Sequence, residues 1–469
     1  MNSGRVGSWA DALGRRIADF LLRRWDAARA PLPPKPSPLA QPPVPADLLD
    51  LLRWLGVALI GAGETTNRVQ SMLDELARRY GAEGVHFFVL PTGVFVRIQD
   101  ANGSAVDIMS ASVDTLRLDQ IAALYRLLDR VKRDLPPPTE VTRSLQQIFE
   151  STPRNPVLLT MLGQVVLTLG LGLMLNPSVH ALVGYCVLGA LVGVLVWLAH
   201  RIPLLSLALP VTAAALVSWV AFRFPAQLSG GHPSQLLIPA VATMLPGAML
   251  TNGTIELATG SMVAGASRLI YGLNVLLLLS FGLLIGLEGL GRHPVPEAAG
   301  VDQLGWWAPF LGVLLIGIGH SWRASAPPKS LGWLLIVLYV TYAAQALGGH
   351  FSGQVLGAFL GGLIAVPAAY LVQRRKNAPP SQVAFLPAFW MLVPGGIGLT
   401  GVSDLIAQSN PNGLHVIVSA LLTVLSIALG VLVGSGLVGD QRPRISTLLD
   451  TFLPADRRYP ADRIEADRP

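Results

Sequence analysis

Charge and cysteine are both scarce in this sequence. Among its 469 residues only 13% are charged, whereas a soluble domain carries roughly 25%, and 52% are hydrophobic. The stretch from Pro156 to Gly439 holds only nine basic and five acidic residues. A soluble globular fold is therefore excluded for most of the chain, and lipid is its expected surrounding.

The one cysteine, Cys186, excludes an intramolecular disulfide and cysteine-based zinc sites, and its place in an apolar run predicts a small buried side chain. The sequence contains no G-x4-G-K-[ST] loop for ATP, and its N-terminus lacks the short apolar core of a secretory signal peptide. We therefore expect neither a cofactor nor a metal site, and no ATP-driven transport by this chain.

Residues 1–45 differ from the rest. Residues 1–30 have the spacing of a basic amphipathic helix, which either lies in a membrane headgroup layer or remains a frayed tail. Eight prolines from Pro31 to Pro45 predict an extended linker. The formal net charge of +6 indicates cytoplasmic loops next to anionic lipid and no nucleic-acid partner.

Residues 46–150 are predicted to form a small cytoplasmic α/β domain. Helical periodicity and strand patterns alternate along this stretch, and Pro91-Thr92-Gly93 reads as a hairpin turn. The expected helices cover 48–62, 68–80, 116–132 and 140–149, and the expected strands cover 85–90, 94–98 and 105–109. A hydrolase here would need a nucleophile, a base and an orienting group, but the region has no cysteine and one histidine, His86, an expected core residue. We expect this region to regulate or gate the membrane part.

Ten apolar segments follow, most of them near the 20 residues that span a bilayer. They lie near 156–175, 178–199, 203–222, 235–250, 268–290, 304–322, 328–346, 352–373, 382–399 and 413–437. The fourth and ninth are short and contain prolines, so either a crossing or a re-entrant loop remains open for each. The sequence thus predicts a polytopic α-helical membrane protein of about ten transmembrane helices.

The positive charges predict the orientation. With ten crossings and a cytoplasmic N-terminus, the inside loops carry seven Lys or Arg residues and the outside loops carry only Arg223 and Arg292. The inside residues are Arg201, Arg268, Arg323, Lys329, Arg374, Arg375 and Lys376. We expect a multi-pass protein of the inner (plasma) membrane whose C-terminal tail, residues 439–469, is also cytoplasmic.

A repeat runs through the membrane region. The pattern P-A-x5-P-G occurs at Pro239–Gly247 and again, 148 residues later, at Pro387–Gly395. The same shift places segments one to five on segments six to ten without a gap, which predicts two repeats over 151–290 and 300–438. Five crossings per repeat invert the second repeat, an arrangement that recurs in secondary transporters with interrupted helices.

A polar stretch follows each Pro-Gly pair, where broken backbone must face protein or a polar cavity. These residues are the candidate substrate pathway: Pro246, Gly247, Thr251, Asn252, Gly253, Pro394, Gly395, Thr400, Gly401 and Ser403. Glu256 and Asp404 are equivalent acids and candidates for proton coupling. Two alternatives remain open: the Pro-Gly pairs are only kinks with capping residues, and Glu256 simply pairs with Arg268 or water.

Several of these motifs resemble one family. The stretch from Gly61 to Val69, which reads GAGETTNRV, resembles the opening signature of the threonine/serine exporter family, and Pro91-Thr92-Gly93 follows at the usual distance. Its Glu64, Thr65 and Arg68 are expected to cap and pair locally at a helix start. Leu245-Pro246-Gly247 and Val393-Pro394-Gly395 resemble the membrane signatures of the family, and the resemblance covers about residues 46–437.

The resemblance implies a cytoplasmic N-terminal domain fused to ten spans that export threonine or serine, driven by the proton gradient through alternating access. The implied partners are a small amino acid, protons and the lipid bilayer, and homo-oligomerisation is left open. The chain is not expected to be an enzyme. The alternatives are a transporter or channel for another small polar metabolite, or a membrane protein with a hydrolase-like N-terminal domain.

Overall fold

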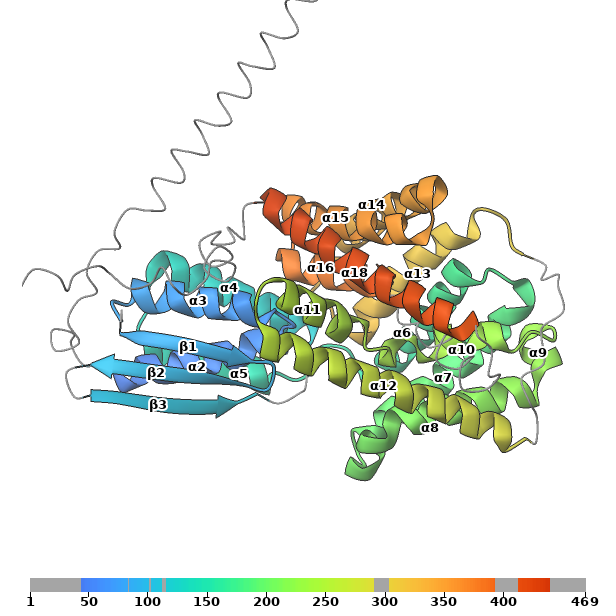
Figure 1. Ribbon diagram of the computed structural model, residues 1–469, viewed down its shortest axis with the longest axis horizontal. Coiled ribbons are helices and arrows are strands. Elements are labelled where there is room, and N and C mark those ends of the chain that lie inside the picture. Colours follow the sequence, from blue (N-terminus) through green and yellow to red (C-terminus); the bar gives the residue numbers. More distant parts are fainter. Residues whose placement is uncertain are drawn as a thin grey trace, which may run out of the picture. The chain divides into compact units, whose positions relative to one another are not determined.

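A computed structural model describes residues 44–82, 84–100, 103–111, 115–290, 303–392 and 412–438. The predicted N-terminal amphipathic helix, most of the proline-rich linker and the C-terminal tail lie outside these residues. In the described part the chain is mostly helical and contains one small sheet (Figure 1).

The N-terminal elements follow the sequence pattern closely. Four helices and three strands occur in the predicted order: α2 (Ala46–Gly61), α3 (Thr66–Arg79), β1 (Val85–Leu90), β2 (Gly93–Asp100), β3 (Gly103–Ser110), α4 (Leu118–Asp134) and α5 (Pro138–Glu150). Each bound differs from its prediction by no more than about two residues, the usual uncertainty of helix and strand ends.

The sheet has the order β1-β2-β3, and the strands lie side by side in Figure 1. β1 and β2 are antiparallel, from the pair Val85 and Ile98 to the pair Leu90 and Gly93 next to the turn. Burial alternates along β1, so His86 is exposed and its interpretation as a core residue is wrong. Successive side chains of a strand point to opposite faces of the sheet. Val85 lies on the face that packs in the core, so its neighbour His86 lies on the opposite face.

One hydrophobic core joins these elements. It contains large, fully buried leucines of α2, α3, α4 and α5, such as Leu52, Leu73 and Leu124. The same core includes Ala326, Leu334 and Val383, which belong to the helical region that follows. The N-terminal elements therefore pack directly on the membrane helices through apolar side chains.

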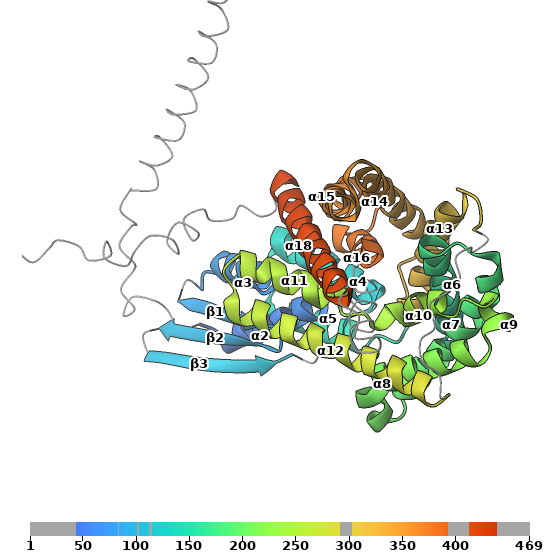
Figure 2. The same ribbon diagram turned by 45° about the vertical axis from the view of Figure 1, so that its right-hand side comes forward.

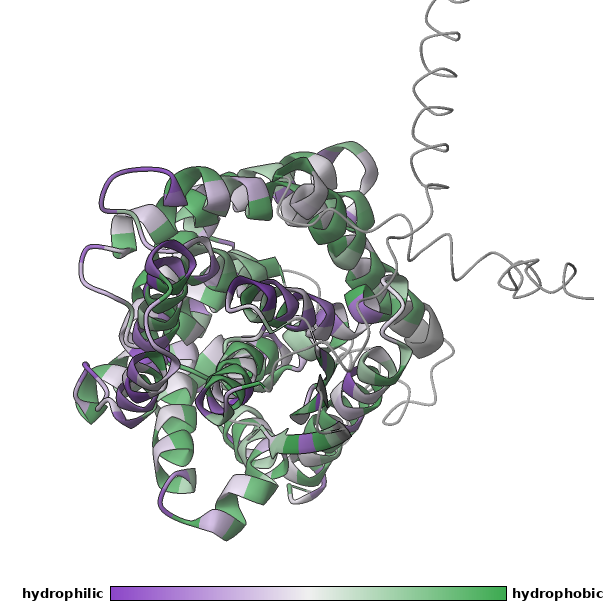
Figure 3. Ribbon diagram, turned by 90° about the vertical axis from the view of Figure 1, so that its left-hand side faces the viewer, coloured by the Kyte–Doolittle hydropathy of each residue, from purple (hydrophilic) through white to green (hydrophobic). Residues whose placement is uncertain are grey.

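Most of the remaining helices are long and apolar, and Figure 3 shows their hydrophobic residues in green. They are α6 (Val157–Leu175), α7 (Leu182–Ala199), α8 (Pro203–Arg223), α9 (Pro225–Ser229), α10 (Ser234–Val241), α11 (Gly247–Ala258), α12 (Met262–Glu288), α13 (Ala308–Arg323), α14 (Leu331–Ser352), α15 (Gln354–Gln373), α16 (Ser381–Leu392) and α18 (Asn412–Val438), with short 3-10 turns η2 (Val179–Ala181) and η3 (Ala242–Met244). Within the described residues, seven helices can cross a membrane, or eight if one bent pair counts as a span.

The described part of each predicted apolar segment is largely helical, but the helices of the sixth and ninth segments are short. α13 has 16 residues and α16 has 12. α12 begins at Met262, six residues before the predicted segment, so Arg268 lies inside a helix and not in the loop to which the charge pattern assigned it. An arginine is accommodated there because an acid pairs with it.

The helix packing follows the 148-residue shift. α8 packs along α12, and α15, which is α8 shifted by 148 residues, packs along α18, the counterpart of α12 (Figure 2). α6 and α13, the first helices of the two predicted repeats, also pack against each other.

Glycines carry these contacts at equivalent positions. A methyl group added at Gly286 would lie 2.3 Å from the Ala215 carbonyl oxygen, and one at Gly434 would lie 2.5 Å from the Leu363 carbonyl oxygen. Gly286 and Gly434 are 148 residues apart in the sequence, and so are Ala215 and Leu363. Only glycine allows the two helix backbones to approach so closely.

Candidate functional site

The chain breaks its helical path at Leu245 and Pro246. α10 and η3 lead into the break and α11 leaves it at an angle of 60°. Proline has no N–H and pushes the preceding residue out of the helical region, and Leu245 is extended with a ψ of 131°. The Pro246-Gly247 pair thus divides the fourth apolar segment into two helices.

The N-terminus of α11 is open at this break. Among the described residues no side chain caps it, and the first N–H groups of a helix have no acceptor within their own helix. These groups and the helix dipole favour a negatively charged partner. Thr251, one turn further on, is fully buried, and its hydroxyl finds no hydrogen-bond partner within the described ranges.

Two side chains of α6 and η3 meet beside the break. Gln164, only 2% exposed, donates from Nε2 to the Thr243 hydroxyl at 3.3 Å, and Thr168 lies one turn along α6 at 3.5 Å from the same nitrogen. Sequence reasoning did not select Gln164 or Thr243. The available signal was a lone amide in an otherwise apolar segment, which lipid does not tolerate without a partner.

The far end of α11 carries a buried ion pair. Glu256 is fully buried, Arg268 of α12 is 6% exposed, and Arg268 Nε lies 3.0 Å from Glu256 Oε2. The Nε–H does not point at that oxygen, so the contact is an ion pair without an aligned hydrogen bond. The pairing with Arg268 that the sequence left open is present.

The segment Gly63–Arg68, which reads GETTNR, contacts this ion pair. The backbone N–H of Thr66, in the first turn of α3, donates to Glu256 Oε1 at 2.8 Å. Thr65 has the N-cap position of α3, but its side chain makes no capping hydrogen bond. The acceptor at the start of α3 is therefore a carboxylate 190 residues away, which no local capping rule can predict.

Three further contacts join the same elements. Arg268 Nη2 donates to the Glu64 carbonyl oxygen at 3.3 Å, and Asn252 Nδ2 donates to the Gly63 carbonyl oxygen at 3.2 Å. The Asn67 amide donates to the Thr259 hydroxyl at 2.5 Å. The loop between α2 and α3 is thus bound to both sides of the α11–α12 connection.

Glu64 is a second buried acid at this place. It is 4% exposed and accepts a hydrogen bond from the Tyr125 hydroxyl of α4, and Arg68 Nε lies 3.3 Å from its Oε2. The expected local pair of Glu64 and Arg68 is therefore present. We call Glu64, Thr66, Arg68, Glu256 and Arg268 the Glu256–Arg268 cluster. Its two acids face two arginines, so the charges balance.

The structure divides the predicted pathway residues of the first repeat. Pro246, Gly247 and Thr251 lie at or near the break, whereas Asn252 lies against the α2–α3 loop. Gly253 packs on α12, where an added methyl group would lie 3.0 Å from the Gly265 carbonyl oxygen.

The other predicted positions lie apart or are not described. Pro91 and Thr92 form the turn between β1 and β2, with Gly93 as the first residue of β2, and the Thr92 carbonyl accepts from Ala111 N at 2.9 Å. The second-repeat residues lie outside the described residues: Pro394, Gly395, Thr400, Gly401, Ser403 and Asp404.

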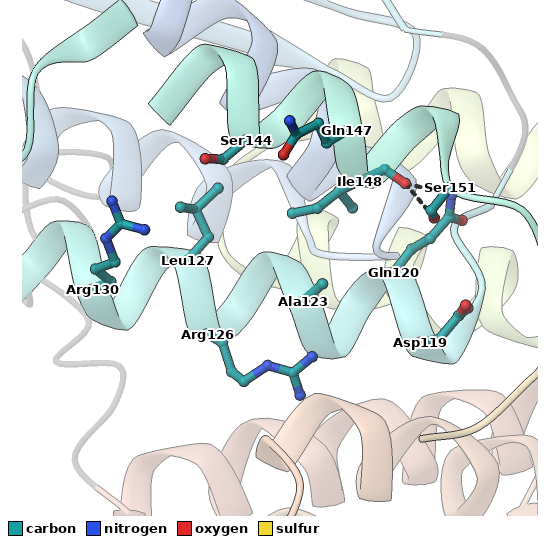
Figure 4. Close-up of a pocket in the computed structure, with 10 residues that line it drawn as sticks. All are labelled: Asp119, Gln120, Ala123, Arg126, Leu127, Arg130, Ser144, Gln147, Ile148 and Ser151. Carbon is teal, nitrogen blue, oxygen red and sulfur yellow. Dashed lines mark hydrogen bonds between the residues drawn. The ribbon is translucent and has the colours of Figure 1, made fainter. Parts of the chain in front are cut away.

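A shallow groove of about 480 Å³ lies between α4 and α5 (Figure 4). Gln120 and Ser151 both donate to the Ile148 carbonyl there, at 2.9 and 2.7 Å. None of the lining residues belongs to α10, α11 or α12, so this groove is separate from the break. No group of three or more His, Cys, Asp or Glu side chains that could hold a metal occurs in the described part of the chain.

Comparison with known proteins agrees with the membrane architecture. Among curated proteins, the chain is 26% identical over 380 residues to the uncharacterized protein C7D4.12c of Schizosaccharomyces pombe, covering 76% of this chain and 49% of that protein. It is 27% identical over 363 residues to pheromone-regulated membrane protein 10 of Saccharomyces cerevisiae, covering 72% and 45%. The chain thus spans about half the length of these relatives. No solved structure matches it.

The family described as "Putative threonine/serine exporter" matches residues 50–289 and 307–438. The match includes the GETTNR segment, the broken span and the long apolar helices. The chain is therefore a multi-pass membrane protein that belongs to the threonine/serine exporter family.

Proposed function

We propose that this protein is a secondary transporter that exports a small hydroxy amino acid, threonine or serine, driven by the proton gradient. The observation that carries the proposal is the break at Leu245-Pro246, which leaves the N-terminus of α11 uncapped inside an apolar helical region. A helix N-terminus at membrane depth is suited to the carboxylate of an amino acid.

Alternating access is the mechanism that fits the repeat. Helix pairs α8–α12 and α15–α18 pack in the same way at positions 148 residues apart, which supports two copies of one unit. With five crossings each, the copies have opposite orientations in the membrane. In this proposal each of the two Pro-Gly motifs serves one side of the membrane, and rocking of one repeat against the other exposes a shared site alternately.

Proton coupling is proposed at Glu256, with Asp404 as its counterpart in the second repeat. Protonation of Glu256 removes one charge from its ion pair with Arg268 and weakens its hydrogen bond with the Thr66 N–H. A charged carboxylate also stabilises the start of α3 through the helix dipole. The protonation state of one buried acid therefore affects α11, α12 and α3 together.

The N-terminal region acts as a cytoplasmic gate in this proposal. Its α2–α3 loop is bound to α11 through Asn252 and to α12 through Arg268, so it would have to shift when those helices move. We place the protein in the inner (plasma) membrane with both termini in the cytoplasm, as the charge pattern predicts.

The experiment is efflux of preloaded threonine and serine from cells that express the protein, with and without a protonophore. Protonophore-sensitive efflux above that of empty-vector cells is expected. Glu256→Gln and Asp404→Asn should each reduce efflux about tenfold or more while the protein stays in the membrane. Glu288→Gln, an exposed acid at the end of α12, is the control and should export normally.

Efflux that resists the protonophore would remove the coupling and keep the transporter. Normal efflux by both acid variants would show that the coupling assignment is wrong. Absence of threonine and serine efflux from the wild-type protein would refute the proposed substrates.

A further inference from the structure

Gln164 is a buried amide whose hydrogen-bonding capacity is only half used. It lies in the middle of α6, is 2% exposed, and binds Thr243 and Thr168 through Nε2 alone. Its Oε1 is buried and has no hydrogen-bond partner among the described residues. A buried acceptor without a donor loses its hydrogen bonds to water without replacement, so such an atom calls for a ligand or water.

The amide is located at the broken span. Thr243, its partner, belongs to η3, and the break begins two residues later. Gly247, four residues after Thr243, opens the uncapped first turn of α11. Gln164 thus contacts the segment that leads into the break, four residues before the start of α11, whose first N–H groups have no acceptor within their own helix.

These two groups complement the two charges of an amino acid. The N–H groups and dipole at the start of α11 favour a carboxylate, whereas an amide oxygen accepts from an ammonium group or a hydroxyl. In the orientation that the structure shows, Nε2 faces the two threonine hydroxyls and Oε1 is the atom without a partner, so the free group is an acceptor.

We propose that Gln164, together with Thr243, binds the ammonium group of a zwitterionic α-amino acid whose carboxylate lies at the N-terminus of α11. This inference rests on the proposed export function and identifies a residue of its substrate site. Gln164 is then a binding residue that sets the preference for amino acids over hydroxy acids.

Close packing around Gln164 favours a small ligand. α7 approaches α6 through glycines: a methyl group added at Gly189 would lie 2.9 Å from Val165 Cα, and one at Gly193 would lie 3.6 Å from Gln164 Cβ. Lipid is therefore kept from the amide, and there is little room for a bulky side chain.

Binding of radiolabelled threonine to the purified full-length protein in detergent tests the inference. Two unlabelled compounds are each added as competitors of the radiolabelled threonine. One is threonine, and the other is 2,3-dihydroxybutyrate, the analogue in which a hydroxyl replaces the ammonium group. In the wild-type protein, threonine should compete about tenfold or more better than the analogue, because the analogue's hydroxyl forms a neutral hydrogen bond in place of the stronger one from the charged ammonium group.

Gln164→Leu should weaken threonine binding about tenfold or more and abolish the preference over the analogue. Gln164→Glu, which retains an acceptor, should keep the preference. Gln345→Leu on α14 is the control for placing leucine at a membrane glutamine and should bind as the wild-type protein does.

Equal binding by Gln164→Leu and wild-type protein would overturn the inference and leave the export proposal intact. If Gln164→Leu does not fold, the analogue competition on the wild-type protein decides, and equal competition by the two compounds would overturn the inference. A wild-type protein that neither binds nor exports threonine or serine would refute the export proposal and this inference together.

Discussion

The ion pair between Glu256 and Arg268 is buried and joins α11 to α12. Both side chains are at least nine-tenths buried; Glu256 also binds the start of α3, and Arg268 also binds the α2–α3 loop. Removal of one member leaves the other charge buried without compensation, which is far more costly than removal of both. Loss of one of the two residues is therefore expected to destabilise the fold more than loss of both.

Arg268→Met should destabilise the protein by about 3 kcal/mol, because Glu256 then remains buried and unpaired. The double variant Glu256→Gln with Arg268→Met should recover most of that loss. Thermal unfolding of the purified proteins measures the difference, and Arg201→Met, an exposed arginine between α7 and α8, is the matched control. A double variant no more stable than Arg268→Met would contradict the pairing.

The ion pairs of Glu75 predict that the stability of the N-terminal region depends weakly on pH. Burial raises the pKa of its carboxyl, but the charges of Lys132 and Arg79 outweigh this and hold the pKa below the ordinary value of 4.5. A lowered pKa in the folded state stabilises the protein above 4.5, and the effect disappears as pH falls through the folded value.

Because Glu75 is 38% exposed, solvent screens its ion pairs and the contribution is about 0.5 kcal/mol or less. Glu75→Gln should therefore lower the unfolding temperature slightly at about pH 7 and leave it unchanged at about pH 3. A larger loss at the acidic pH would show that the sign of the effect is reversed.

At the scale of helices and strands, the sequence pattern predicted most of what the structure describes. A short apolar run bounded by turn residues located β1 within its observed bounds, Val85–Leu90. The start of α12 was placed six residues late because Arg268 was taken as a loop residue. A charge that is neutralised by a distant acid cannot be distinguished by hydropathy from one that faces water.

Pro246→Ala should restore a backbone donor at the break and allow α10 and α11 to approach one continuous helix. We expect the protein to remain in the membrane and efflux to fall about tenfold or more. Pro210→Ala, inside α8, is the matched control, because that proline lies within a helix that continues on both sides. Equal efflux by the two variants would show that the break is not used in transport.

The close helix contacts predict which glycines are required. Gly286→Val and Gly434→Val should each prevent stable assembly, because carbonyl oxygens lie 2.3 and 2.5 Å from the added Cβ position. Gly436 lies near the same end of α18 as Gly434, but a Cβ added there meets no atom within 4 Å. Gly436→Val should therefore be tolerated. The amount of monodisperse protein after detergent extraction measures the outcome, and unaffected yields for the first two variants would contradict the packing.

For the whole molecule, the site is where sequence reasoning was least complete. The two Pro-Gly motifs and Glu256 were identified because proline and an acid in an apolar segment are individually conspicuous. Gln164, Thr243 and the capping of Thr66 by Glu256 were missed, because they depend on contacts between α6 and η3 and between α11 and α3. Such contacts are set by packing across the fold and have no local signal.

The broken span and the family membership support the proposal of a transporter, and the 148-residue shift supports the proposal of a shared central site. The central claim is that threonine or serine leaves the cytoplasmic side in exchange for protons. It concerns the whole chain, because the gate, the coupling acid and the substrate site lie on different elements.

The most direct measurement uses the purified full-length protein in liposomes loaded with radiolabelled threonine, with an acidic medium outside and a neutral interior. The account predicts threonine release that is faster with the pH gradient than without it, and that a protonophore slows to the gradient-free rate. Release at the same rate with and without the gradient would contradict proton-driven export, and no release above that of protein-free liposomes would contradict threonine transport itself.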